Sequence, residues 1–307
     1  MRVFVTGASG WIGSPTVDEL LAAGHEVTGL ARSDATAAAL AAKGAQVRRG
    51  DLDDLTGIRA GAADAEAVIH LANKHDFDNP AVSNRAERAA IEAIGETLAD
   101  SGRPFLFASG IMPIGGRTLT EDDASPFHGV DTPRGGGENL ALGYLSRDVH
   151  VVAVRFAPTT HGVGDNGLMS RLVAIAREKG VAGYVGEGTN RWPAVYRSDA
   201  ARLVRLGLEK ASAGAILHAV GEEGVPTRQI AEAIGRALDV PVTSVAAQDV
   251  PAHFGWLGGF FGMDLPASSA RTQELLGWTP TGPTLLHDLD TGAYSHAQHH
   301  DPVMGSR

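Results

Sequence analysis

Cysteine is absent from this chain of 307 residues. Without thiols the protein can form no disulfide, can use no thiolate nucleophile and can hold no cysteine-ligated zinc. The sequence also lacks an uninterrupted apolar run of about 18 residues, the length that a membrane-spanning helix needs, so we expect no contact with a membrane. A strand-like segment begins directly after Met1 and leaves no room for a signal peptide, so we expect a cytoplasmic protein.

Clusters of lysine or arginine are absent as well, and the formal net charge is −10. We therefore expect no nucleic-acid partner and a small-molecule substrate instead. Hydrophobic residues make up 43% of the chain, which is enough for the core of one large α/β unit or of two interleaved domains.

A glycine-rich turn stands at the start of the chain. The β-branched and aromatic run Arg2–Thr6 is typical of a buried strand. Gly7, Gly10 and Gly13 follow it, and a helical apolar pattern then runs to Gly24. Such a turn lets the backbone approach a pyrophosphate closely, while the helix start points free N–H groups at it. The alternative is a glycine-rich turn without a ligand.

The end of the next strand, residues 26–30, indicates which dinucleotide is bound. An acidic residue there binds the ribose 2′-hydroxyl of NAD, whereas arginine accommodates the 2′-phosphate of NADP. The position holds Arg32, flanked by Ser33, while Asp34 is expected to cap the following helix. The sequence therefore predicts NADP(H), unless Arg32 is only a solvated surface charge.

Further strand-like runs alternate with helical patterns along the chain. They predict an α/β fold, a doubly wound parallel Rossmann sheet with a smaller C-terminal α/β substrate domain. We expect a dinucleotide-binding domain at residues 1–160, and we expect residues 192–222 to return to it. A substrate domain is expected at residues 161–191 and 223–294, and a tail at residues 295–307. Histidines in the tail would bind a metal only if it were ordered, so no metal site is predicted.

Several motifs resemble the extended short-chain dehydrogenase/reductase family, which includes nucleotide-sugar epimerases and 3β-hydroxysteroid-dehydrogenase-like proteins. They are Thr6–Gly13, Asp51-Leu52, His70–Ala72, a serine after the fifth strand, and Arg155–Pro158 before His161-Gly162.

The resemblance implies the cofactor contacts. The pyrophosphate would contact Gly7, Ser9, Gly10, Trp11, Ile12 and Gly13, and the adenine would contact Asp51 and Leu52. The ribose and the nicotinamide would lie along Leu71, Ala72, Asn73 and Ser109. The amide group of the nicotinamide would be covered by Pro158, Thr159 and Thr160.

The proton-handling pair of that family is missing. Most members carry Tyr-x-x-x-Lys on a helix, where tyrosine donates a proton and lysine lowers its pKa. None of the four tyrosines here is followed four residues later by lysine. By distance from Ser109, Arg134 and Glu138 take the two places, as in an atypical subgroup of the family. The glycines 135–137 between them each cost about 1 kcal/mol in a helix, so we expect the start of this helix to be frayed, mobile or not helical before Glu138.

The sequence therefore does not identify the residue that donates the proton. Arginine does not act as an acid, but Arg134 can bind a carboxylate or stabilise an oxyanion. A proton can come from Ser109, from water, or from His75 or His161 at the ends of strands; the alternative for each histidine is an ordinary surface position. Glu138 is either catalytic or simply paired with Arg134. Aligning Ile114-Gly115 with a family Tyr-Gly would move the serine position to Gly110.

The sequence predicts an NADPH-dependent oxidoreductase that reduces a small or medium organic carbonyl compound or a related unsaturated substrate. Two alternatives remain: a catalytically silent NADP(H)-binding sensor or regulator, and a sugar-epimerase-like isomerase. A monomer or a homodimer is expected.

Overall fold

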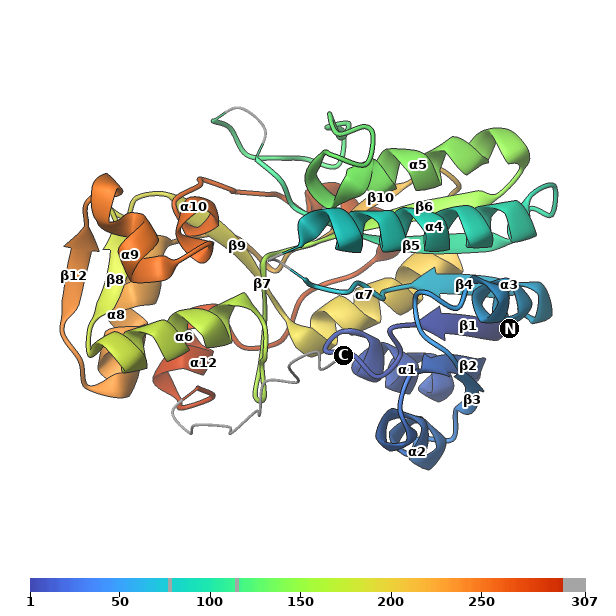
Figure 1. Cartoon of the computed structure of the whole chain (residues 1–307), viewed down its shortest axis with the longest axis horizontal. Coiled ribbons are helices and arrows are strands. Elements are labelled where there is room, and N and C mark those ends of the chain that lie inside the picture. Colours follow the sequence, from blue (N-terminus) through green and yellow to red (C-terminus); the bar gives the residue numbers. More distant parts are fainter. Residues whose placement is uncertain (77–78, 114–115, 295–307) are drawn as a thin grey trace.

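A parallel sheet of seven strands runs through the larger part of the molecule in the order β10-β6-β5-β4-β1-β2-β3 (Figure 1). The computed structural model describes residues 1–76, 79–113 and 116–294. The strands are β1 Arg2–Thr6, β2 Glu26–Ala31, β3 Gln46–Arg49, β4 Ala67–His70, β5 Pro104–Gly110, β6 His150–Phe156 and β10 Ile216–Ala219. The predicted doubly wound parallel sheet is confirmed.

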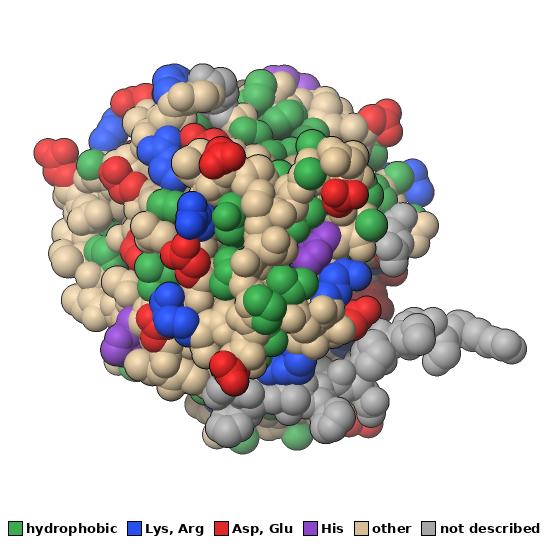
Figure 2. All heavy atoms as spheres, turned by 90° about the vertical axis from the view of Figure 1, so that its left-hand side faces the viewer, with side chains coloured by type: hydrophobic (Ala, Val, Ile, Leu, Met, Phe, Trp, Pro, Cys, Tyr) green, Lys and Arg blue, Asp and Glu red, His purple; other side chains and the backbone are tan. Residues whose placement is uncertain are grey.

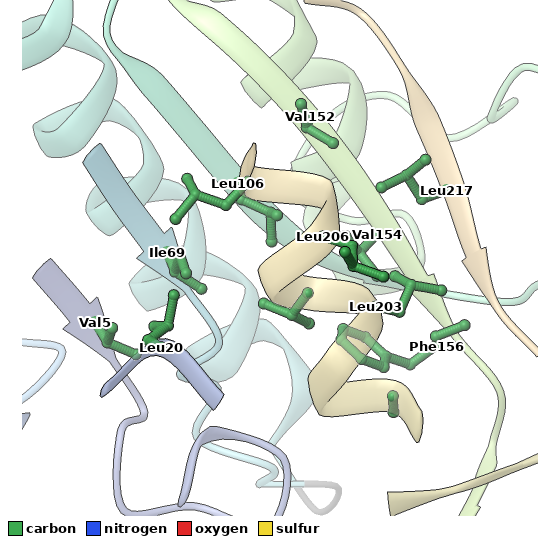
Figure 3. Close-up of a cluster of buried hydrophobic side chains, with 14 of the residues drawn as sticks. Val5, Leu20, Ile69, Leu106, Val152, Val154, Phe156, Leu203, Leu206 and Leu217 are labelled. Atoms are coloured by element: carbon green, nitrogen blue, oxygen red, sulfur yellow. The ribbon is translucent and has the colours of Figure 1, made fainter. Parts of the chain in front are cut away.

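Helices cover both faces of this sheet, because its strands are apolar on both sides. One face carries α1 Gly13–Ala22, α2 Asp34–Ala42 and α7 Arg197–Lys210, and the other carries α3 Leu55–Asp64, α4 Pro80–Leu98 and α5 Gly137–Gly143. Figure 3 shows the first of these layers, in which Val5, Ile69 and Leu106 of three strands pack with Leu20 of α1 and Leu203 of α7.

A second hydrophobic core lies beside the sheet, on the left in Figure 1, and is built around the buried Trp192 and Phe261. Its helices are α6 Leu168–Lys179, α8 Thr227–Leu238, α9 Val250–Phe254, α10 Leu257–Phe261 and α12 Leu285–Asp290. Its strands are β7 Thr159–His161, β9 Arg191–Tyr196 and β11 Glu222–Pro226 in one sheet, and β8 Ala182–Val185 with β12 Val242–Val245 in another.

The surface of this end of the molecule mixes charges of both signs with small apolar areas (Figure 2). The remaining elements are α11 Ala270–Leu276, which packs on α7, and the short 3₁₀ turns Pro133–Gly136, Tyr144–Arg147 and Ala247–Asp249. Among the described residues, no helix has the length and apolarity that crossing a membrane would require.

Candidate active site

The glycine turn has the shape that a dinucleotide phosphate needs. Gly7 has φ of +69°, and a Cβ there would lie 2.7 Å from the amide nitrogen of Ala72. A Cβ on Gly13 would overlap the carbonyl oxygen of Gly7, to which the Gly10 N–H donates at 2.9 Å. No side chain caps the start of α1 and its first turn holds no acid. The backbone therefore forms a cradle with free N–H groups, which fits a pyrophosphate.

Trp11 connects the glycine turn to β7 and α7. Its indole Nε1 donates to the carbonyl oxygen of Thr160 at 2.7 Å. The guanidinium of Arg197 lies 4.0 Å above the indole ring, and its Nε donates to the Trp11 carbonyl oxygen at 2.6 Å. Ser9 is exposed and Ile12 is half-buried beside the turn. Sequence reasoning missed Arg197, because nothing in its neighbourhood in the chain points to residue 11.

The residues expected around the nicotinamide amide divide into two kinds. Pro158 follows β6 and is half-buried, whereas Thr160 of β7 is buried and its carbonyl oxygen accepts from Trp11. Thr159 is buried, and its hydroxyl donates to the carbonyl oxygen of Pro193. The hydroxyl of Thr160 likewise donates to the carbonyl oxygen of Ala157 at 3.1 Å, so the side chains of both threonines are committed to the fold.

At the end of β2, Arg32 is exposed, and no described carboxylate pairs with its guanidinium. Ser33 caps α2, since its hydroxyl accepts the N–H of Thr36 at 3.2 Å. The expectation that Asp34 caps this helix is wrong; Asp34 pairs with Arg49 at 2.9 Å. Arg32 thus has no carboxylate partner among the described residues, whereas Arg49 does.

The residues expected to contact the adenine and the ribose lie at the ends of β3 and β4. Asp51 is exposed and its carboxylate accepts the N–H groups of Asp53 and Asp54 at 2.9 and 3.2 Å, while Leu52 is buried. Leu71 and Ala72 follow β4 directly beside Gly7. Asn73, next in the chain, donates through Nδ2 to Glu87 of α4 at 2.9 Å.

One pocket brings together three of the predicted catalytic residues: Ser109, Arg134 and Glu138. It lies at the carboxyl end of β5, where open α/β sheets bind ligands. Arg155 of β6, the neighbour of Ser109 across the sheet, completes the polar part. The rest of the lining is Gly110, Met112, Leu119, Ser125, Pro126, Phe127, Pro133, Gly136 and Gly137. Both serine alignments thus point into this pocket; Ile114 and Gly115 lie outside the described residues.

Arg134 and Glu138 do not pair with each other, and each has a different partner. Arg134 forms its ion pair with Glu87 and also donates to the carbonyl oxygen of Ala108 at 3.3 Å. Glu138 forms a two-pronged pair with Arg155 at 2.6 and 2.9 Å. The alternative in which Glu138 pairs with Arg134 is therefore wrong.

The sequence did not identify Glu87 as the partner of Arg134, although its position in the helix gave one indication. It lies within the apolar stripe of α4, on the same helical face as the buried Ser83, Ala90, Ile91 and Ile94. A carboxylate in such a stripe needs a buried partner, and only the fold shows which one.

A left-handed turn aims Arg134 into the pocket. Arg134, Gly135 and Gly136 have φ of 51°, 60° and 62°. A Cβ on Gly136 would lie 2.9 Å from the amide nitrogen of Gly129, so glycine is needed there. The glycines therefore end the turn, and the helix α5 begins only at Gly137, in line with the expectation of no regular helix before Glu138.

The histidines have different surroundings. Desolvation by neighbouring groups, followed by the positive charge of Arg134, lowers the pKa of His75 to about 4, although the residue is exposed. It is a poor proton donor at neutral pH. His161 is fully buried in the second core, with Nδ1 2.7 Å from Asp288, and does not line the pocket. The expectation that His161 lies at the mouth of the site is wrong; β7 turns it inward.

His70 at the end of β4 adds a buried neutral group. Its Nδ1 lies 2.7 Å from the hydroxyl of Thr6, and its ring stacks on Phe107. Burial and then the charge of Arg134 lower its pKa to about 3. The tail at 295–307, with its histidines, lies outside the described residues.

Comparisons with known proteins agree with the Rossmann-like fold. Residues 3–128 match the model of the NAD dependent epimerase/dehydratase family. The uncharacterized protein C2A9.02 of Schizosaccharomyces pombe is 45% identical over 296 residues, which cover 96% of this chain and 100% of that protein. The 3-diazoavenalumate denitrifying reductase of a Streptomyces species is 28% identical, over 92% of this chain and 97% of that protein. The structure of DesIV, a dTDP-glucose 4,6-dehydratase of Streptomyces venezuelae with NAD bound, matches with a TM-score of 0.75 at 21% identity, over 95% of this chain and 96% of that chain.

Proposed function

The chain belongs to the extended short-chain dehydrogenase/reductase family, and we propose that it works as an NADPH-dependent reductase. As a member of that family it is an NAD(P)-dependent oxidoreductase. Its substrate is a small or medium organic carbonyl compound or a related unsaturated group, reduced without the family's tyrosine and lysine. The observation that carries this proposal is the pocket that holds Ser109 and Arg134 together. The name of the Streptomyces relative, a reductase, supports the same class of reaction.

The residues present fit the cofactor. A Cβ on Gly7 would collide with the backbone of Ala72, and a Cβ on Gly13 would collide with the carbonyl oxygen of Gly7, so glycine at both positions keeps the turn tight enough for a phosphate. The exposed guanidinium of Arg32 at the end of β2 supports NADP(H) over NAD(H), since a 2′-phosphate needs a cation at that place.

The chain's own groups position and polarise the substrate, while bound NADPH supplies the hydride. Arg134 keeps its proton throughout, because a guanidinium stays charged in proteins. It stabilises the negative charge that develops on the substrate oxygen. Its Nε–H is buried and has no partner in the part of the chain that the structure describes, so the guanidinium keeps one donor that the described residues do not use. The Ser109 hydroxyl, in the same pocket, relays a proton from water to that oxygen.

Turnover tests the assignment. NADPH absorbance is followed with a panel of ketones, aldehydes, imines and activated alkenes. Arg134→Ala should lower kcat/KM by at least about 100-fold, the usual cost of losing an oxyanion donor, while NADPH binding stays unchanged. Arg147→Ala, which removes an exposed arginine outside the pocket, is the matched control. NADPH binding without turnover on any member of the panel would instead favour the silent sensor.

Cofactor choice is tested separately. Arg32→Ala should weaken NADPH binding and leave NADH binding nearly unchanged, because only NADPH carries the 2′-phosphate. Arg59→Ala, an exposed arginine of α3, removes the same charge elsewhere. An unchanged NADP/NAD preference in Arg32→Ala would show that the preference does not depend on this residue.

A further inference from the structure

The side chain of Glu87 occupies an unusual position behind the pocket. Only 1% of it is exposed, and it lies on the buried face of α4. Its Oε1 accepts from Nη2 of Arg134, and its Oε2 accepts from Nδ2 of Asn73 at 2.9 Å. The Asn73 Oδ1 in turn accepts the N–H of His75 at 2.8 Å. One carboxylate therefore fixes Arg134 and the chain that follows β4 at the same time.

The turn that carries Arg134 is held by the same helix. Asn84 Nδ2 donates to the carbonyl oxygen of Val130 at 2.8 Å, and Arg88 Nη1 donates to that of Gly135 at 2.8 Å. Arg134 is consequently fixed in backbone and side chain, with one-third of its side chain exposed. Glu87 acts on the pocket through Arg134 and does not line it.

The charges of the pocket cancel in pairs. Two guanidinium groups line it, those of Arg134 and Arg155. Glu87 balances the first, and Glu138 balances the second. The nearby rings of His70 and His75 do not restore a positive charge, since both are neutral at pH 7. The pocket thus contains strong hydrogen-bond donors without a net positive charge.

The apolar part of the lining agrees with this balance. Met112, Leu119, Pro126 and Phe127 surround the polar groups. A ligand carboxylate entering this pocket would lose its hydration and would meet the field of two buried carboxylates as well as two arginines. A neutral oxygen would accept a hydrogen bond from Arg134 without that cost.

Building on the proposed reductase function, we propose that Glu87 sets the substrate class: the pocket takes a neutral, largely apolar carbonyl compound and rejects an anionic one. Glu87 is a positioning and specificity-determining residue, which converts Arg134 from an anion anchor into a neutral-oxygen donor. Without its charge, Arg134 becomes an uncompensated cation that favours a carboxylate.

Matched probes test the proposal. Benzamide and benzoate have the same shape and differ in charge, and their binding to the NADPH-loaded protein is measured by calorimetry. The wild type should bind benzamide more tightly than benzoate. Glu87→Gln keeps the shape of the side chain, and should tighten benzoate binding by about 10- to 100-fold with little effect on benzamide, the range expected for a hydrogen bond to a charged group. Glu92→Gln, on the same helix with 53% of its side chain exposed, removes the same charge from the surface and should change neither.

The same substitutions are then compared on benzaldehyde and 4-carboxybenzaldehyde, with the ratio of their kcat/KM values as the readout. A purely structural role of Glu87 would lower both values together and leave their ratio unchanged. If the wild type binds benzoate as well as benzamide, or if Glu87→Gln gains no benzoate affinity, the proposal is overturned; the wild-type result decides even where the variant fails to fold. Absence of turnover with the expected binding pattern would count against the reductase function and leave the charge selection standing.

Discussion

The guanidinium of Arg155 and the carboxylate of Glu138 are joined by two hydrogen bonds, of 2.9 and 2.6 Å, and 3% and 5% of their side chains are exposed. Arg155 belongs to β6 and Glu138 to α5, so the pair fastens the helix to the sheet beneath the pocket. His218 of β10 touches the same guanidinium at 3.3 Å. A side chain in the expected place of the family's lysine has thus become part of a buried polar network.

Removal of the Glu138 carboxylate should destabilise the protein strongly. Glu138→Ala leaves Arg155 charged and buried without its counter-ion, which typically costs about 3–5 kcal/mol. The free energy of unfolding is measured in urea. Glu232→Ala breaks the exposed pair with Arg228 and should cost less than about 1 kcal/mol. Equal losses of unfolding free energy in the two variants would show that the buried pair stabilises the protein no more than the exposed pair does.

Gly13 is expected to be indispensable for cofactor binding. A Cβ at this position would overlap the Gly7 carbonyl oxygen, so Gly13→Ala must displace the turn. Each backbone donor that then misses the phosphate loses about 1.5–3 kcal/mol, which predicts at least about tenfold weaker NADPH binding by fluorescence titration. Gly143→Ala, at a position where nothing lies within 4 Å, is the control and should bind NADPH normally. Normal binding by Gly13→Ala would contradict the phosphate cradle.

Because of the backbone conformation at Arg134, we expect a glycine variant at this position to be more stable than an alanine variant. Its φ of 51° is left-handed, a conformation that costs a residue with a Cβ about 1–2 kcal/mol and costs glycine little. Arg134→Gly and Arg134→Ala lose the same ion pair with Glu87, so their difference isolates the backbone term. The glycine variant should be the more stable of the two by about 1 kcal/mol in urea unfolding. A more stable alanine variant would mean that the turn is right-handed.

His70 should make the fold sensitive to mild acid. Its pKa is about 3 in the folded protein, against an ordinary value of 6.5. Between these values the unfolded chain binds more protons than the folded one, so stability falls as the pH drops below about 6.5. Lowering the pH from 7 to 5 should cost about 2 kcal/mol through this residue. His70→Asn should lose correspondingly less than the wild type over this range, whereas the exposed His128→Asn should behave like the wild type. Identical pH dependence in all three proteins would exclude His70 as the source.

The main sheet was predictable because most of its strands are short apolar runs between turn residues, and their alternation with helices implies parallel order. The helix α3 was missed, since Gly57 and Gly61 weaken its pattern. Gly61 is small because Phe4 of β1 packs against its backbone, a tertiary reason that no local pattern shows. The strands around the second core were mostly missed for a related cause: they are three to six residues long and pair across distant segments.

The tight turn between β1 and α1 could be predicted from its glycine spacing alone, but the partners of the charged residues could not. Arg134 and Glu138 have the i,i+4 spacing of a helical ion pair, which assumes that both lie on one helix. The left-handed turn at 134–136 removes Arg134 from that helix and directs it to Glu87. His161 was misplaced for a comparable reason, because the short strand β7 carries it into the second core.

The last strand of the main sheet, β10, lies against β6, although β7, α6, β8, β9 and α7 separate the two in the chain. During translation β6 therefore leaves the ribosome with its outer edge unpaired, and that edge stays open until residues up to Ala219 have emerged. The main sheet therefore cannot be completed until a segment that belongs mostly to the second core has been synthesised. The part of the enzyme that is synthesised first is consequently completed late.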